Sequence, residues 1–273
     1  MSRGTWALRE CRKLELRFWE AYVSGGSSTL IKGLGLLRLM SQYPQGAPAA
    51  VFAKESGMPF STAYRLLNTL TDAGYAEFDA TTKQYRVGLT VFELSQRVAS
   101  ARGYNGSVIP VLKTLSAATN ESCLFSVRDG HETVTIHTVD GPEFRQTTDP
   151  GDRLSLHMSS MGKAILAALP ETEVQQLVSG MQFEARTEHT AVEPGRLLEQ
   201  IAAGRKDGYV YQREEVDLGM NAIARAVVGP TGAVLGAVAI AAPLFRADRD
   251  QLMTYREALA EASQRLAATL PTV

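Results

Sequence analysis

The stretch PFSTAYRLLNTLTDAG, residues 59–74, predicts a helix that opens at Pro59 or Ser61 and closes at Gly74. Its apolar residues recur at helical spacing, and one face carries Ala63, Leu66, Leu67, Leu70 and Ala73. The opposite face carries Ser61, Thr62, Arg65, Asn68 and Thr69. A helix with one apolar face and one face of short polar and basic side chains is typical of a DNA recognition helix.

Two shorter helices are expected before this one. Ser28 or Thr29 caps the first, whose apolar face carries Leu30, Leu34, Leu37 and Met40. The second starts at Pro48 and ends at Gly57. After Gly74 the apolar residues alternate, which predicts a β-hairpin over 75–87 with its turn at 79–83. Three helices followed by a hairpin form a winged helix-turn-helix.

The rest of the chain alternates between helices and paired strands. We expect helices over 89–102, 108–119, 159–169, 170–178, 195–206 and 247–270. We expect strands over 124–128, 133–139, 144–148, 209–212, 223–228 and 234–241. The break Gly103-Tyr104-Asn105-Gly106 marks a domain boundary. Strands paired as hairpins beside helices indicate an antiparallel α+β domain.

Composition excludes several classes of protein. A chain of 273 residues with 45% hydrophobic and 21% charged residues is neither disordered nor a disulfide scaffold. Two cysteines, Cys11 and Cys123, fit a reducing compartment. No apolar run reaches the ~18 residues of a membrane span, and no secretory signal is visible. We therefore expect a cytoplasmic protein that contacts no membrane.

Charge is divided unevenly along the chain. Residues 1–100 hold 12 Lys and Arg against 8 Asp and Glu, whereas residues 101–273 hold 16 against 21. The basic front favours an anionic partner such as double-stranded DNA, with a chance asymmetry as the alternative.

Specific residues of the front match DNA-binding chemistry. Arg65 is suited to a two-pronged contact with guanine, and Asn68 to adenine. Backbone N–H groups around Ser61 and Thr62 favour a phosphate at the helix N-terminus. The predicted DNA-binding set is Ser61, Thr62, Tyr64, Arg65, Asn68, Thr69, Lys83 and Arg86. The alternative is a winged helix with a solvated face that contacts only protein.

Several motifs resemble those of the IclR family of bacterial transcription regulators. The front carries the family's Pro-x-Ser-Thr-x-x-Arg-Leu-Leu-x-Thr-Leu pattern over 59–70, followed by Gly74-Tyr75 and Tyr85-Arg86-Val87-Gly88. The rear carries Leu156-His157, Gly162-Lys163-Ala164, Gly208-Tyr209, Glu214-Glu215 and Gly219. The likeness covers roughly residues 29–268. Phe60 departs from the lysine common in the family at its position, so we expect one phosphate contact fewer.

The resemblance implies an α+β chain with four parts: an N-terminal helical extension over 1–26, a winged helix-turn-helix over 27–88, a linker helix over 89–104 and a GAF-like, antiparallel-sheet effector-binding domain over 105–273. It implies homodimers or homotetramers that repress or activate operons without a cofactor. The effector lies between the sheet and the loop of residues 150–162. Residues 1–26 are expected to be either an additional helix that stabilises the dimer or the product of a misassigned start codon.

Departures from the family pattern concern the effector site. Gln212 replaces an acid, Ala222 replaces Cys or Ser, and Ala239-Ile240-Ala241 replaces Ser-x-Ser. Because each change removes a polar group, we expect an apolar or aromatic effector rather than a two- or three-carbon acid. The predicted effector-binding set is Met158, Ser160, Met161, Gln212, Met220, Ala222, Ala224, Ala239 and Ala241. Strand alternation places Arg225 on the opposite face, towards solvent or an interface; alternatively it pairs with an effector carboxylate.

Signals of an enzyme are weak. Gly162-Lys163 is not a phosphate-binding loop, because His157 and Ala164 stand where Gly and Ser or Thr are needed, and Lys163 is expected to be structural. The four histidines lack metal-ligand spacing. His131 and His137 are expected on a strand. His157 is expected either to line the effector loop or to have a packing role in the core. Glu214 and Glu215 are expected on opposite faces of a strand, where their carboxylates are either solvated or cap a neighbouring element. The alternative function is an enzyme that converts a small metabolite, with the front as an interaction module.

Overall fold

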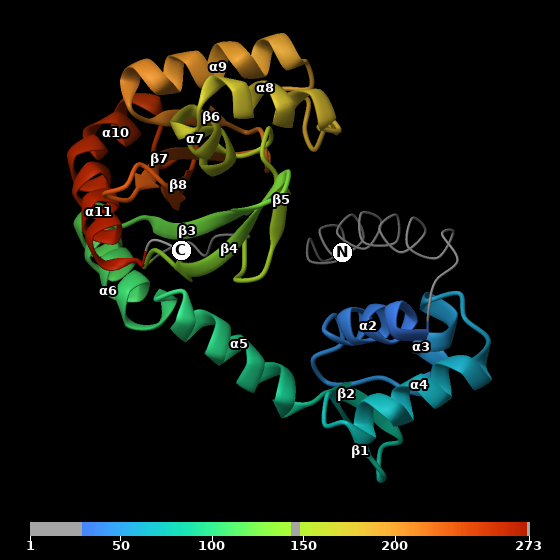
Figure 1. Cartoon of the computed structure of the whole chain (residues 1–273). Helices are drawn as coiled ribbons and strands as arrows, with labels where there is room; N and C mark the ends of the chain where they lie inside the picture. Colours follow the sequence, from blue (N-terminus) through green and yellow to red (C-terminus); the bar gives the residue numbers. More distant parts are fainter. Residues whose placement is uncertain (1–28, 143–147, 272–273) are drawn as a thin grey trace. The chain divides into compact units, whose positions relative to one another are not determined.

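The computed structural model describes residues 29–142 and 148–271, and their contacts divide the chain into two compact units between Val98 and Ala99. The N-terminal helical extension expected over 1–26 lies outside the described residues. The front unit contains α2 (Thr29–Met40), α3 (Ala49–Glu55), α4 (Phe60–Asp72), β1 (Ala76–Asp79) and β2 (Gln84–Val87), as Figure 1 shows. This order confirms the winged helix-turn-helix.

Prolines begin the two helices of the helix-turn-helix. Pro48 and Pro59 are the residues that precede the first turns of α3 and α4, and neither caps its helix through a side chain. A fixed φ near −65° suits proline to this position, where a backbone N–H has no helical partner. The core beneath the two helices gathers buried residues from all three helices and the wing, namely Leu36, Met40, Phe52, Leu66, Leu67 and Tyr85.

The expected apolar face of α2 is wrong in part. Met40 is buried, but Leu30 and Leu34 are 70% and 56% exposed, and Gly33 and Leu36 are buried instead. Both sets recur at helical spacing, so periodicity does not separate them. The set with Gly33 packs inward, and a Cβ at Gly33 would lie 4.0 Å from Cδ2 of Leu66 on α4, at ordinary contact distance.

The wing is a tight antiparallel hairpin. Phe78 lies opposite Tyr85, and the Asp79 carboxylate accepts the N–H groups of Thr81 and Thr82 at 2.8 and 3.2 Å. These hydrogen bonds lower the pKa of Asp79. Lys83 completes the turn with a φ of 59°. Ala47 adds a short bridge to Tyr85, so the wing is joined to the segment between α2 and α3.

Helix α5 (Leu89–Ala101) follows the wing, and none of its residues is buried in the described chain. Helix α6 (Tyr104–Thr119) belongs to the rear unit and is kinked at Asn105 and Gly106, where the sequence predicts a break. The expected helix over 108–119 is confirmed as the regular part of α6.

The rear unit is built on a six-stranded antiparallel sheet with the order β5-β4-β3-β8-β7-β6. Its strands are β3 (Ser122–Asp129), β4 (Glu132–Val139), β5 (Arg153–Ser155), β6 (Val210–Arg213), β7 (Met220–Val228) and β8 (Val234–Pro243). The two predicted hairpins, β3–β4 and β7–β8, are confirmed, and so is the antiparallel α+β class. The expected strand over 144–148 falls mostly outside the described residues, and the short strand β5 was not expected.

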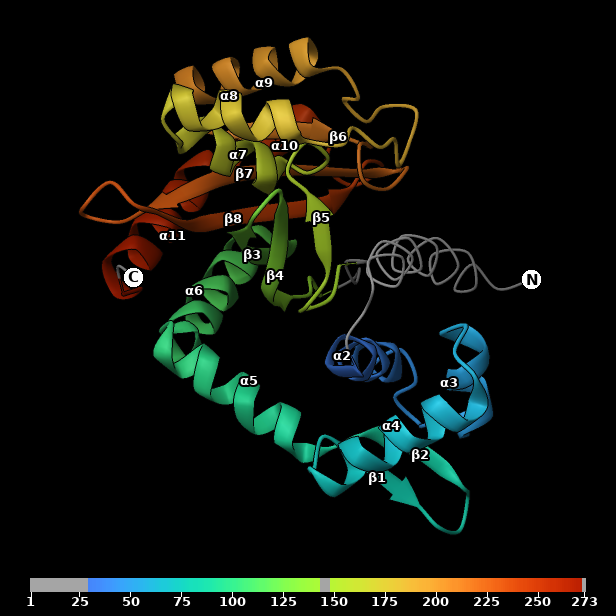
Figure 2. The same ribbon diagram turned by 45° about the vertical axis from the view of Figure 1, so that its right-hand side comes forward.

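Helices cover both faces of the sheet. Figures 1 and 2 show α7 (Ser160–Ala168) on the inner face, with α8 (Glu171–Gly180) and α9 (Pro194–Asp207) outside it. Helices α6 and α11 (Arg256–Thr269) pack on the other face. The closing helix expected over 247–270 is interrupted at Tyr255, which separates α10 (Arg249–Thr254) from α11.

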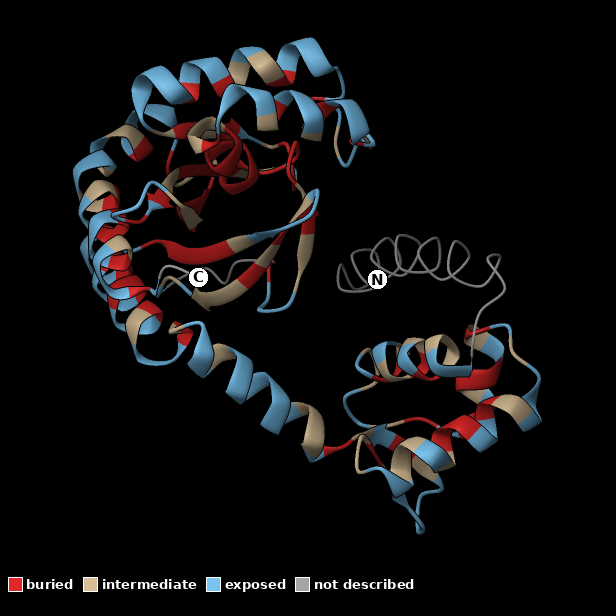
Figure 3. Ribbon diagram, viewed as in Figure 1, coloured by how far each residue is buried: buried red, intermediate tan, exposed pale blue. Residues whose placement is uncertain are grey.

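Alternation along β7 separates two apolar cores. Ile223 and Val227 pack with α6 and α11, whereas Ala222 and Ala224 pack with α7. The buried inner strands are visible in Figure 3. Large branched residues therefore fill the outer core, and small alanines form the surface beneath α7. No described helix has both the length and the apolar character needed to cross a membrane.

Candidate nucleic-acid interface and effector site

The predicted DNA-binding residues of α4 share its outer face. Ala63, Leu66 and Leu67 are buried against the front core. Thr62 and Asn68 are partly buried, and the remaining predicted residues of the front unit are exposed, namely Ser61, Tyr64, Arg65, Thr69, Lys83 and Arg86. The structure thus places the expected polar face outward, on the second helix of a helix-turn-helix.

The three basic residues of this interface differ in their local partners. No described residue hydrogen-bonds or forms an ion pair with the guanidinium of Arg65. Arg86 forms a 2.8 Å ion pair with Glu77 on the neighbouring strand of the wing. The ammonium of Lys83 lies 6.0 Å from the centre of the Phe78 ring. Arg65 is therefore the cation best placed to bind a base or phosphate without first losing a partner.

Asn68 is already engaged within the protein. Its Oδ1 accepts a 2.8 Å hydrogen bond from the hydroxyl of Tyr85, which is 2% exposed. Reading adenine with two hydrogen bonds needs both Oδ1 and Nδ2 of an asparagine. The expected contact of Asn68 therefore competes with Tyr85. Sequence reasoning did not assign Tyr85 this role, although strand alternation places it on the inner side of the wing.

Alanines form the floor of the expected effector site. Ala222 lies opposite Ala241, and Ala224 lies opposite Ala239, so that all four side chains share one face of β7 and β8. The four are at most 7% exposed and belong to the same apolar cluster as Met161 of α7. The structure therefore brings together these five predicted residues.

Two further predicted residues lie at the start of α7: Met158 in the loop before it and Ser160 as its first residue, both buried. Between them Ser159 caps α7, because its hydroxyl accepts the N–H of Gly162 at 3.0 Å. A Cβ at Gly162 would lie 2.3 Å from the carbonyl oxygen of Leu156. The Gly-Lys-Ala motif therefore begins with glycine so that α7 can approach this loop closely.

The last two predicted effector residues border the alanine floor. Gln212 is opposite Ala222, but its Oε1 accepts the N–H of Glu215 at 2.8 Å. Met220 starts β7 and is partly exposed. Gln212 thus has a structural contact of its own, and Met220 lies at the end of the strand.

Two buried hydroxyls adjoin the alanine floor and were not predicted. Ser126 on β3 lies directly opposite Ala237 on β8. Its Oγ is 3.2 Å from Oγ1 of Thr135 on β4, and both residues are at most 3% exposed. Ser126 lies two positions after Leu124, which packs in the same cluster as the alanines, and residues two apart on a strand share a face. This spacing is the sequence signal that assigns Ser126 to the face of the alanine floor.

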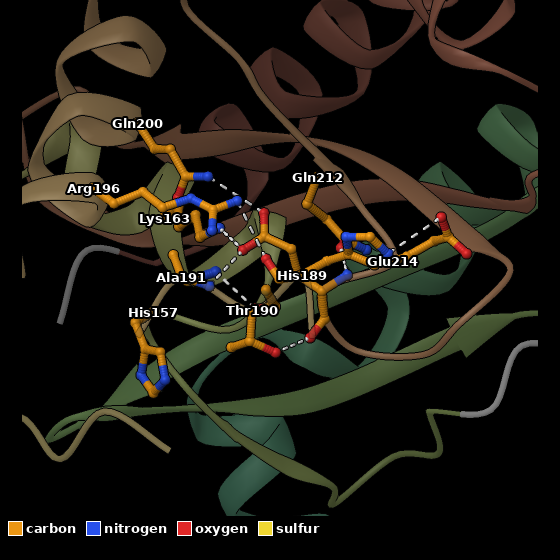
Figure 4. Close-up of polar contacts among 12 residues, drawn as sticks. His157, Lys163, His189, Thr190, Ala191, Arg196, Gln200, Gln212 and Glu214 are labelled. Atoms are coloured by element: carbon orange, nitrogen blue, oxygen red, sulfur yellow. Dashed lines mark hydrogen bonds and ion pairs between the residues drawn. The ribbon is translucent and has the colours of Figure 1, made fainter. Parts of the chain in front are cut away.

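A buried ion pair fastens α7 to the segment after β6 (Figure 4). Nζ of Lys163 lies 2.5 Å from Oε2 of Glu215, and their side chains are 0% and 5% exposed. The same carboxylate accepts the N–H of Ala191, and the Glu215 carbonyl accepts the Thr190 hydroxyl at 2.7 Å. Burial lowers the pKa of Lys163, and the charge of Glu215 opposes that shift.

This network confirms a structural role for Lys163 and corrects the expectation for Glu215, which is not solvated. Glu214 and Glu215 directly follow β6, and Glu214 turns the chain there with a φ of 55°. Glu215 therefore points back to α7, while the Glu214 carboxylate accepts the N–H of Gly219 at 2.8 Å. The two carboxylates do not share a site, as expected, but the reason is this turn rather than alternation along a strand.

His157 has a packing role. Its side chain is fully buried, with Nε2 3.0 Å from the carbonyl oxygen of Glu184 and Nδ1 2.7 Å from the hydroxyl of Ser155. Because a carbonyl only accepts, Nε2 donates and Nδ1 accepts. Burial is the main cause that lowers the pKa of His157. His137 lies on β4 as expected, but His131 lies in the turn before that strand.

Arg225 lies on the opposite face of β7 from Ala222 and Ala224, as strand alternation predicts. Its Nη1 donates to the carbonyl oxygen of Gly208 at 3.0 Å, and the residue is partly exposed. The guanidinium therefore holds the turn that ends α9.

Comparisons with known proteins cover both units. The family model described as IclR helix-turn-helix domain matches residues 29–80, and the one described as Bacterial transcriptional regulator IclR C-terminal matches residues 96–268. The HTH-type transcriptional repressor AllR of Escherichia coli K12 is 26% identical over 252 residues, which are 92% of this chain and 93% of AllR.

Solved structures have the same fold. A putative transcriptional regulator from Rhodococcus sp. RHA1 has a TM-score of 0.77 and 26% identity, and the match covers 89% of this chain and 97% of that one. An IclR homologue from Microbacterium hydrocarbonoxydans, complexed with 4-hydroxybenzoate, has a TM-score of 0.75 and 22% identity over 88% of this chain and 100% of that one. These proteins are regulators, so the enzyme alternative has no support among them.

Proposed function

Because the chain belongs to the IclR family of bacterial transcriptional regulators, we propose that it binds operator DNA through α4 and the wing and responds to a small, largely apolar metabolite. The observation that carries the DNA-binding half is the unpartnered guanidinium of Arg65 on the exposed face of α4. Arg65 contacts a guanine, and Ser61 and Thr62 bind a phosphate at the helix N-terminus.

The remaining predicted residues contribute around this contact. Tyr64 and Thr69 extend the surface of α4, and Lys83 and Arg86 contact phosphates through the wing. Asn68 reads a base only after it leaves Tyr85. The operator affinity therefore depends on Arg65 more than on any other single side chain of the set.

The effector half of the proposal rests on the alanine floor. Ala222, Ala224, Ala239 and Ala241 offer no hydrogen bond, and a polar group left unpaired against them costs roughly 1–3 kcal/mol. An effector with an apolar or aromatic body therefore fits this surface better than a two- or three-carbon acid. Its few polar atoms bond to the hydroxyls of Ser126 and Thr135, which adjoin the floor.

The remaining contacts to the effector in this proposal come from residues around the floor. Met158, Ser160 and Met161 close the site from α7 and the loop before it, while Gln212 and Met220 border it from β6 and the start of β7.

We further propose that the protein works as a homodimer or homotetramer in the cytoplasm, where chromosomal DNA lies. The exposed side chains of Leu94 and Val98, four positions apart on α5, give one copy an apolar surface for another. Two copies then present two recognition helices to half-sites about one helical turn, or a multiple of it, apart.

In vitro selection tests the DNA-binding half. The full chain is incubated with a random library of double-stranded DNA, and bound sequences are amplified through several rounds. The proposal predicts enrichment of a motif with two related half-sites. A library that stays random after selection, from a chain shown to be folded and oligomeric, contradicts it.

A thermal-shift screen tests the effector half. The full chain is melted with 4-hydroxybenzoate and benzoate as aromatic probes, and with glyoxylate and pyruvate as small acids. A compound present at about 100 times its Kd stabilises the native state by about 2.7 kcal/mol. We expect aromatic compounds to raise the melting temperature and to change DNA affinity. Stabilisation by the small acids alone contradicts this assignment.

A further inference from the structure

Two aromatic side chains form an exposed stack at the start of α4. The rings of Phe60 and Tyr64 lie 5.9 Å apart, centroid to centroid, with 19° between their planes. The residues are 55% and 47% exposed. A spacing of four residues places both on one side of the helix, so each ring limits the movement of the other.

The stack continues a row of side chains that faces the wing. Phe60, Tyr64 and Asn68 follow one another at four-residue intervals, and Asn68 accepts the hydrogen bond from Tyr85. The neighbouring row, at the same spacing, is Ser61, Arg65 and Thr69. The outer face of α4 therefore carries a polar row and, beside it, a row that begins with two aromatic rings.

The position of the stack brings it to the DNA. The N-terminal residues of a recognition helix approach base edges in the major groove. Phe60 is the first residue of α4, and Arg65 lies in the neighbouring exposed row. A phenylalanine has no hydrogen-bonding atom, and the only apolar group on base edges in the major groove is the C5-methyl of thymine.

We propose that Phe60, supported by Tyr64, reads a thymine methyl group in each operator half-site. The inference rests on the proposed function and adds a specificity determinant to it. The contact buries one methyl group against the Phe60 ring, and its loss corresponds to about a four-fold change in Kd.

The test uses duplexes selected by the full chain from a random library. Each thymine of the selected sequence is replaced in turn by deoxyuridine, which removes only the methyl group. Fluorescence anisotropy at one fixed salt concentration then gives Kd for the wild-type chain, Phe60→Ala and the control Ser61→Ala. The control alters the same helical turn but belongs to the neighbouring, polar row.

For one thymine per half-site, deoxyuridine weakens binding of the wild type and of Ser61→Ala by about four-fold, while Phe60→Ala binds both duplexes equally. The inference is overturned if deoxyuridine weakens binding of all three proteins equally at every thymine. It is also overturned if the selected half-site contains no thymine. If selection enriches no sequence, the proposed function fails together with this inference. If a motif is enriched without coupling to Phe60, only the inference fails. Phe60→Leu, which keeps an apolar contact, retains part of the coupling and checks that the helix is intact.

Discussion

The hydroxyl of Tyr85 on the wing donates a 2.8 Å hydrogen bond to Oδ1 of Asn68 on the recognition helix. Tyr85 is also joined to Ala47 through reciprocal backbone hydrogen bonds of 3.0 and 2.9 Å. One buried tyrosine thus connects the wing, the recognition helix and the segment between α2 and α3. The DNA-binding surface is therefore held as one unit before DNA arrives.

Removing the Tyr85 hydroxyl is expected to weaken the front unit and free Asn68. We expect Tyr85→Phe to lower the free energy of unfolding by about 0.5–1.5 kcal/mol, because a mostly buried hydrogen bond is lost. Chemical denaturation measures this change. Tyr75→Phe is the matched control, since no described residue forms a side-chain hydrogen bond with Tyr75. Equal effects of the two substitutions would show that the bond contributes nothing.

Releasing Arg86 from Glu77 is expected to strengthen DNA binding without changing sequence preference. In Glu77→Gln the guanidinium loses the negative charge that lies 2.8 Å away, which favours its binding to a phosphate. We expect tighter binding to selected and random duplexes alike, with the slope of log K against log[salt] steeper by about one. Glu93→Gln on α5 removes the same charge and controls for general repulsion. An identical slope in all three proteins argues against a phosphate contact by Arg86.

Breaking the buried ion pair of the effector domain is expected to destabilise it strongly. Lys163→Met leaves the Glu215 carboxylate buried without its 2.5 Å partner, and such changes typically cost about 3–5 kcal/mol. The double variant Lys163→Met with Glu215→Leu recovers much of this loss, because no uncompensated charge remains. Thermal and urea unfolding measure both. A double variant no more stable than Lys163→Met would mean that packing, not charge, dominates.

Acidification is expected to destabilise the effector domain through His157. Burial holds the pKa of His157 below its ordinary value of about 6.5, so the unfolded chain binds a proton at higher pH than the native state does. Stability from this group is therefore complete above about pH 6.5 and declines as the pH falls towards the lower native pKa. We expect His157→Gln, which keeps a donor for the Glu184 carbonyl, to show a shallower decline between pH 7 and 5. Parallel pH profiles for the two proteins would assign the acid sensitivity to other groups.

The order of elements could be predicted from the sequence because its signals are local. Pro48 and Pro59 begin helices, Ser159 caps α7, and Asp129-Gly130 turns the β3–β4 hairpin. Each depends on residues within a few positions of one another. The outer face of α4 could be predicted for the same reason, since it follows from periodicity, whereas the alanines of the floor were predicted from departures from the family pattern.

Contacts between distant residues could not be predicted in this way. Leu34 of α2 is exposed because Gly33 and Leu36 face the core instead, with Gly33 next to Leu66 of another helix. Glu215 is buried because Lys163, fifty-two positions earlier, lies beneath it. Tyr85 on the wing donates a hydrogen bond to Asn68 on α4, so Asn68, which was expected to contact a base, has a structural partner instead. None of these partners is visible in local spacing.

The most direct test of the account compares the affinity of the full chain for its selected duplex with that for a random duplex of equal length, at one fixed salt concentration. We predict a difference of about 10³-fold or more for the wild type. Arg65→Ala is expected to lose about 1–3 kcal/mol on the selected duplex and clearly less on the random one. Equal affinity of the wild type for both duplexes, or full selectivity retained by Arg65→Ala, would contradict sequence reading by α4.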